Sequence, residues 1–279
     1  MSAAIPDFLV DMAAGSRARL ARARSLRSES ELRQLAARLP AVPSLRLSPQ
    51  RFDLIAELKL RSPAVGKLRD AGPENVAAHV QEYAAAGAAA VSVLTEPSRF
   101  DGSMAHLEQA ARVLPIPAMR KDFLVDPYQV LEARVAGAGG VLVIVRMLPS
   151  AELEALIDCA LEQQMFVLVE AFDAADIELA TGLIDARAAD RERLLLGINC
   201  RDLASLQIVP ARLLELAPQL PRHLRLVAES GVATADDAAR IAAAGYDLAL
   251  VGSALMQGGE PRELALAMLR AGRAARVGA

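Results

Sequence analysis

The chain is poor in the residues that mark extracellular, metal-binding or nucleic-acid-binding proteins. Its 279 residues include no tryptophan and only two cysteines, Cys159 and Cys200, too few for a disulfide framework or a cysteine-rich metal site. A net charge of −3 leaves no electrostatic footprint for nucleic acid. No apolar run reaches the roughly 18 residues that a membrane helix needs. We therefore expect a cytoplasmic protein with no nucleic-acid partner and no membrane association.

What is present favours a well-packed globular protein, since 53% of the residues are apolar and 23% are charged. Arginine and serine dominate residues 15–28, a composition that would also suit a transit peptide. Asp7 and Asp11 precede this segment, and Ser28 and Glu31 have the spacing of a capping box. We therefore interpret the segment as an ordinary solvated helix.

Beyond residue 50, eight short apolar runs alternate with alanine-rich helical patterns. The runs cover residues 53–60, 88–95, 116–123, 139–148, 165–172, 193–200, 224–231 and 246–253. Such runs, separated by helices, predict a buried parallel sheet, and eight units favour an α/β fold of the (β/α)₈ TIM barrel type. An open doubly wound sheet would need a glycine-rich fingerprint after the first strand, and "KLRSP" is not one. We expect a helical extension over residues 1–48, packed on a catalytic barrel over residues 49–279.

Polar residues gather at the predicted strand ends, where TIM barrels place their active sites. These residues are Glu57, Lys59, Lys121, Glu170, Asn199, Arg201 and Ser230. Any one of them could be an exposed rim residue. A buried unpaired charge costs several kcal/mol, so a set drawn from five strand ends should be mutually paired or held for a ligand. The pattern predicts an active site.

Two glycine-bounded segments, "ESG" at 229–231 and "VGSAL" at 251–255, follow the seventh and eighth strands. Loops at these places in a barrel commonly bind phosphate through backbone amides and a helix start. Phe100 and Phe123 follow the second and third strands and could form an aromatic wall or simply pack in the core. We expect a phosphorylated small-molecule substrate.

Several segments together resemble the indole-3-glycerol phosphate synthase family, over about residues 50–268. The most specific are "RKDFLVDPYQ" at 120–129 and "GINCRDL" at 197–203, supported by "IAELKLRSPAVGKL" at 55–68 and the run from "AESG" to "VGSALM" at 228–256. The resemblance implies ring closure of 1-(2-carboxyphenylamino)-1-deoxyribulose 5-phosphate, with loss of CO₂ and water, in tryptophan biosynthesis. It implies neither a metal nor an organic cofactor.

Position by position, the resemblance assigns Lys121 as the general acid on the ribulose carbonyl. Glu170 and Lys59 assist the dehydration, with the division between the lysines left open, while Glu57 and Asn199 position hydroxyls and the lysine heads. The other implied positions are Ser62 and Arg201 for anionic groups, Phe123, Leu142, Ile144 and Leu206 for the aryl pocket, and Ser230, Gly231, Gly252 and Ser253 for the phosphate.

The chain departs from the family pattern at Cys200, where a second asparagine is usual, and at Phe172, where histidine is common. Neither departure removes an expected catalytic group. Other functions stay open. A class I aldolase would use Lys121 as a Schiff-base nucleophile, an aminoaldose–ketose isomerase would use an acid/base pair on the first and fifth strands, and a ligand-binding barrel would not catalyse. We expect a monomer or a weak homodimer.

Overall fold

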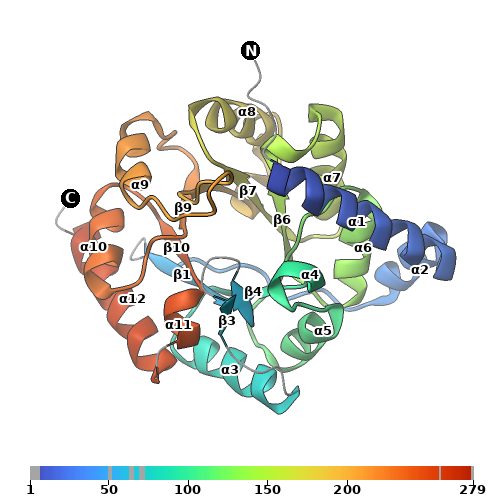
Figure 1. Cartoon of the computed structure of the whole chain (residues 1–279), viewed down its shortest axis with the longest axis horizontal. Coiled ribbons are helices and arrows are strands. Elements are labelled where there is room, and N and C mark those ends of the chain that lie inside the picture. The colour runs from blue at the N-terminus through green and yellow to red at the C-terminus, as the bar shows by residue number, and fades with distance from the viewer. Residues whose placement is uncertain (1–6, 50–51, 63–65, 69–72, 258, 278–279) are drawn as a thin grey trace.

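The computed structural model describes residues 7–49, 52–62, 66–68, 73–257 and 259–277, and its centre is a closed barrel of eight parallel strands (Figure 1). In chain order these are β1 (Asp53–Leu58), β4 (Ala90–Leu94), β5 (Ala118–Lys121), β6 (Gly140–Ile144), β7 (Phe166–Ala171), β8 (Leu194–Asn199), β9 (Arg225–Glu229) and β10 (Leu248–Val251). Each predicted apolar run contains one strand. The barrel closes where β1 pairs with β10. The predicted TIM barrel is confirmed.

Helices surround the barrel and cover its outer face (Figure 1). They are α3 (Pro73–Ala85), α5 (Met104–Val113), α6 (Pro127–Val135), α7 (Ser150–Glu162), α8 (Ala174–Asp185), α9 (Ala211–Leu216), α10 (Ala235–Ala243) and α12 (Pro261–Val277). Strands β6 and β7 are buried along their whole length because helices cover one face and the barrel interior the other. A capping box of Thr234 and Asp237 begins α10, and Gly245, with φ +104°, follows its end.

Short elements shape the end of the barrel where the strands finish. They are the two-stranded sheet of β2 (Arg61–Ser62) and β3 (Gly66–Lys67), the helices α4 (Pro97–Phe100) and α11 (Ser253–Gln257), and the 3₁₀ turn η1 (Val145–Met147). Two further 3₁₀ turns, η2 (Ala188–Arg193) and η3 (Ala217–Gln219), precede β8 and follow α9.

Two extra helices precede the barrel, as expected. Figure 1 shows α1 (Asp7–Leu26) crossing in front of the barrel and leading to α2 (Glu29–Arg38), which packs beside α6. Ser28 caps α2, and its capping box with Glu31 is present. The arginine-rich residues up to Leu26 belong to α1. Within the described ranges, no helix is long and apolar enough to cross a membrane.

Candidate active site

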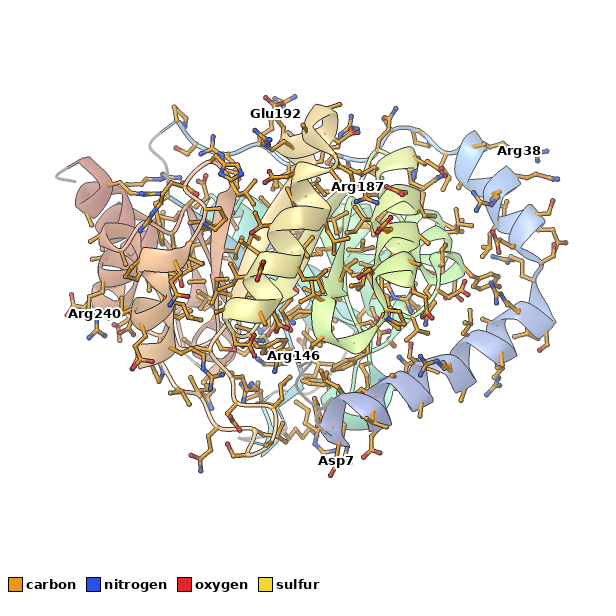
Figure 2. All side chains as sticks on the ribbon, turned by 90° about the horizontal axis from the view of Figure 1, so that it is seen from above. Asp7, Arg38, Arg146, Arg187, Glu192 and Arg240 are labelled. Carbon is orange, nitrogen blue, oxygen red and sulfur yellow. The ribbon has the colours of Figure 1, made fainter. Side chains whose placement is uncertain are left out.

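A cavity of about 350 Å³ opens at the carboxyl ends of the strands, beneath the start of α1. Figure 2 shows this side of the barrel at the bottom, where Arg146 follows β6 and α1 begins at Asp7. The sequence-predicted residues that line the cavity are Glu57, Lys59, Ser62, Phe100, Lys121, Phe123, Leu142, Ile144, Glu170, Asn199, Arg201, Ser230, Gly231, Gly252 and Ser253. Residues from eight strand ends therefore converge on one space.

The first ion pair in the cavity joins the end of β1 to the residue that follows it. Lys59 Nζ lies 2.8 Å from Glu57 Oε1, and both side chains are buried. Burial alone would raise the pKa of Glu57, but the ammonium groups of Lys59 and Lys121 outweigh it and hold this pKa below its ordinary value. The carboxyl group of Glu57 is therefore ionised at neutral pH.

The second cluster surrounds Lys121 at the end of β5. Its Nζ lies 3.4 Å from Glu170 Oε2 and 3.9 Å from Glu229 Oε2. Burial disfavours the charged amine, yet the carboxyl groups of Glu170, Glu229 and Glu57 together raise the pKa of Lys121 above its ordinary value. Lys121 is therefore an ammonium ion, ready to donate a proton to a group whose basicity rises during a reaction.

Glu229, at the end of β9, is a site residue that the sequence did not single out. Its side chain is almost completely buried. Burial raises the pKa of Glu229 well above its ordinary value, and the nearby carboxylate of Glu170 raises it further because two close carboxylates resist double ionisation. The position before Ser230, at the end of a buried strand, is the signal that could have revealed it.

Two glycines make room for the buried carboxyl groups. A Cβ atom on Gly197 of β8 would overlap Oε1 of Glu229 and lie 2.9 Å from Leu168 Cδ1. A Cβ atom on Gly252 would overlap Oε1 of Glu57. Both glycines are thus required by close approach of an acidic side chain. At Gly252 this is a different constraint from the phosphate contact that the sequence suggested.

The opposite walls of the cavity differ in character. On one side, the rings of Phe8 and Phe123 meet edge to face with centroids 5.8 Å apart, and Phe100 lies 6.2 Å from Phe123. On the other side, Ser230 and Gly231 both have positive φ angles, +65° and +70°, in the loop after β9. Strain at the non-glycine residue of such a pair is typical of functional sites. The cavity thus has an aromatic wall facing the left-handed turn at Ser230 and Gly231.

Arg201 and Asn199 are joined at the end of β8. Asn199 Oδ1 accepts a hydrogen bond from the Arg201 backbone N–H at 3.0 Å, and Arg201 Nη1 donates to the Leu206 carbonyl oxygen at 2.7 Å. Leu206 itself does not line the cavity. Its left-handed backbone, φ +60°, belongs to the turn that holds Arg201, and Leu203 and Ile208 line the cavity from this loop. The family resemblance implied that Leu206 lines the aryl pocket, and it did not reveal this turn.

Phe172 lies in the cavity wall at the position where the family pattern has histidine. The guanidinium group of Arg146 stands 4.8 Å from the ring centroid, and Arg146 is itself paired with Asp173 and Asp176. This stacking fixes the ring plane. Phe8 and Leu9 of α1 also line the cavity, and sequence reasoning missed both because helix docking is a long-range contact.

Comparisons with known proteins point in one direction. The family model for indole-3-glycerol phosphate synthase matches residues 10–267. A protein named indole-3-glycerol phosphate synthase from Parafrankia sp. (strain EAN1pec) is 41% identical over 249 residues, covering 88% of this chain and 89% of that protein. One of the same name from Kineococcus radiotolerans is 38% identical, covering 95% of each. The crystal structure of 3-hexulose-6-phosphate synthase from Salmonella typhimurium has a TM-score of 0.60 at 16% identity, over 81% of this chain and 99% of that one, a likeness of fold alone.

Proposed function

The chain belongs to the indole-3-glycerol phosphate synthase family, and we propose that it closes the indole ring of 1-(2-carboxyphenylamino)-1-deoxyribulose 5-phosphate, releasing CO₂ and water. The observation that carries the proposal is the cavity that joins Lys59, Lys121 and three carboxyl groups to an aromatic wall on one side and to the loops after β9 and β10 on the other. That arrangement suits a substrate with an aryl group at one end and a phosphate at the other.

The phosphate would bind at the loops after β9 and β10. Ser253 begins α11, and the first N–H groups of a helix have no hydrogen-bond partner within the helix. Gly231 lies in the loop after β9. The aryl group would lie against Phe123 and Phe100, over the floor formed by Leu142 and Ile144. Arg201 and Ser62 would hold the substrate's carboxylate until it leaves as CO₂.

Ring closure needs an acid at the ketone oxygen. The ring carbon that bears the carboxylate attacks the ketone carbon, a C–C bond forms, and the carbonyl oxygen takes a proton from Lys121. The C–CO₂ bond then breaks and its electron pair restores the aromatic ring. Glu170, 3.4 Å from Lys121, is placed to accept a proton from the substrate in the later dehydration and to pass it to the amine, which restores the ammonium.

Dehydration completes the indole. The new hydroxyl leaves as water after it receives a proton, while the aniline nitrogen supplies electrons, and the adjacent CH₂ loses a proton to form the double bond. Lys59 and Glu170 are the groups placed to donate and accept these protons. Ionised Glu57 keeps Lys59 oriented at 2.8 Å, and Asn199 and Ser230 position the substrate's hydroxyls. Because no electrons are gained or lost overall, the reaction requires no redox cofactor.

We add Glu229 to the groups proposed to act on the substrate because of its position beside Lys121 and Glu170. The raised pKa of Glu229 favours its protonated form, whereas the lowered pKa of Glu57 favours the carboxylate. A protonated acid beside the ammonium of Lys121 can donate a hydrogen bond to a substrate oxygen without adding a negative charge. A Schiff-base role for Lys121 is disfavoured by the same geometry, because the surrounding carboxyl groups stabilise the ammonium over the neutral nucleophile.

The test is direct because the chain contains no tryptophan. Indole fluorescence that grows when purified protein meets the anilino-deoxyribulose phosphate can come only from product. We expect saturable turnover, with inorganic phosphate as a competitive inhibitor and a thermal stabiliser through mass action. Absence of indole product from folded protein would refute the function. Incorporation of a ketose phosphate after borohydride treatment would instead favour the aldolase.

We also propose that the enzyme works in the cytoplasm as a monomer or a weak homodimer. Both cysteines are buried and free, which fits a reducing compartment. Sedimentation at micromolar and nanomolar concentrations distinguishes the two oligomeric states. A stable tetramer would contradict both.

A further inference from the structure

The side chains that hold α1 against the barrel mouth form a connected polar network behind the aromatic wall. Arg19, on α1, places Nη2 2.6 Å from Asp122 Oδ1 and Nη1 3.5 Å from Glu96 Oε1. Both carboxylates are 1% exposed, while Arg19 is 29% exposed at their outer side. Arg19 thus spans the loops that follow β4 and β5.

Both carboxylate oxygens of Asp122 accept hydrogen bonds. In the chain, Asp122 lies between Lys121 and Phe123 of the aromatic wall. Its Oδ1 accepts the Phe123 backbone N–H at 2.8 Å as well as Arg19. Its Oδ2 accepts from Thr95 Oγ1 at 2.8 Å and Arg120 Nη2 at 3.1 Å. The carboxylate therefore fixes the backbone directly after Lys121 and the start of Phe123.

Glu96 plays the same part for the neighbouring loop. It caps α4, accepting the backbone N–H groups of Ser98 at 2.8 Å and Arg99 at 2.7 Å. The helix that it caps ends at Phe100, the second ring of the aromatic wall. Two buried carboxylates thus orient Phe100, Phe123 and Lys121, and α1 supplies a cation that bridges them.

We propose that Arg19 is a positioning residue for this active site, acting through Asp122 and Glu96 on the aromatic wall and on Lys121. The inference rests on the proposed function, and its physical basis is the cost of leaving buried carboxylates short of a counterion. Without Arg19, Asp122 keeps Arg120 while Glu96 loses its ion pair. Either the loops shift toward solvent or a carboxylate takes a proton, and both outcomes loosen the backbone around Lys121.

A misplacement of about 1 Å at reacting groups can cost roughly 10² in rate. Arg19 touches neither the cavity nor the phosphate loops, since it is absent from the lining residues. Its loss should therefore affect chemistry and aryl binding more than phosphate binding. Loss of a residue with a purely structural role would lower stability without affecting chemistry and aryl binding more than phosphate binding.

The experiment compares Arg19→Met and Arg19→Lys with Arg17→Met, which removes the same charge from an exposed position on the same helix. In full-length protein, we expect Arg19→Met to lower kcat/KM at least tenfold and to speed hydrogen exchange at the Phe123 amide. Inhibition by inorganic phosphate should change less than twofold. Arg19→Lys should recover part of the loss, because one ammonium keeps the charge but not the two-nitrogen bridge. Arg17→Met should match the wild type.

Equal losses in Arg17→Met and Arg19→Met, or Arg19→Met within twofold of wild type in kcat, KM and Phe123 exchange, would overturn the proposal. If Arg19→Met does not fold, Arg19→Lys decides: kinetics and exchange indistinguishable from wild type would also overturn it. The two proposals fail separately. A wild-type protein that forms no indole product removes the function, while amide exchange still reports whether Arg19 fixes the loop.

Discussion

Gly197→Ala is the substitution whose effect follows most directly from the geometry. The added methyl would overlap Glu229 Oε1 and stand 2.9 Å from Leu168 Cδ1, closer than real Cβ contacts allow. Neither neighbour can move into solvent, because both are buried among barrel side chains. The carboxyl group must therefore turn away from the position that places it 3.9 Å from Lys121 Nζ.

The expected loss of stability is that of overpacking a barrel core, about 1–3 kcal/mol. A chain of this size shifts its Tm by roughly 2–4 °C per kcal/mol, so a decrease of about 2–12 °C is expected. Displacing the Glu229 carboxyl group, which we propose to act on the substrate, by about 1 Å should lower kcat by roughly 10². Differential scanning calorimetry and the indole fluorescence assay measure the two effects on one protein sample.

Gly182→Ala is the matched control. Gly182 lies within α8, exposed, and a Cβ atom there would meet nothing within 4 Å. Alanine favours the helix by about 0.5–1 kcal/mol, so this variant should melt slightly higher with unchanged kcat. Combining Gly197→Ala with Glu229→Asp, which shortens the side chain, should recover stability. A Gly197→Ala protein with wild-type Tm and kcat would refute the reasoning.

Four further outcomes are expected. Lys121→Ala should lower kcat by roughly 10²–10⁴, the range for general acid catalysis. The control is Lys67→Ala, because Lys67 is exposed on β3, and it should leave kcat within twofold of the wild type. Equal rates for the two variants would remove Lys121 from the mechanism. Glu170→Gln should lower kcat with little change in KM. Because Glu170 helps to raise the pKa of Lys121, the substitution should also lower that pKa and move the alkaline limb of the pH–rate profile to lower pH. An alkaline limb that does not move would contradict the pairing of Lys121 with Glu170. Burial raises the pKa of Cys159 and of Cys200 to about 11, so a thiol reagent at pH 8 should react slowly with native protein and rapidly after unfolding. Because both thiols have folded pKa values above the unfolded value, their contribution to stability is complete below about pH 8.5 and is lost as the pH rises toward 11, which denaturant titrations at several pH values can measure.

The barrel could be predicted from the sequence because each strand is a nearly continuous apolar run, but strand ends could not. The run 139–148 stays apolar past Ile144, where the strand ends, because η1 continues with Val145 and Met147 as buried residues. Apolar character records burial, and it does not distinguish a strand from a buried 3₁₀ turn. The last residues of a run are therefore the weakest part of such a prediction.

The site could be predicted to the extent that barrel geometry turns strand order into spatial proximity. Lys121 and Glu170, 49 residues apart in sequence, meet on this basis alone. Glu229 escaped notice because its neighbours Ser230 and Gly231 suggested a phosphate loop, and its unusual proton affinity depends on burial against Glu170. Arg19 could not be found in this way, since nothing local in α1 indicates that its partner lies 103 residues further along the chain.

The closure of the barrel has a consequence for how the protein is made. Asp53 of β1 pairs with Leu248 of β10, so the sheet stays open until nearly the whole chain has been synthesised. At about 5–20 residues per second, Leu248 leaves the ribosome's active centre roughly 10–40 s after Asp53. During that interval β1 has one unpaired edge, and an exposed edge of this kind invites pairing with other chains. Glu57 near the end of that strand and Lys59 just after it form their buried ion pair in the folded barrel, beside Gly252 at the end of β10. We expect nascent chains that end before β10 to bind chaperones and to lack activity altogether, however complete their set of catalytic side chains.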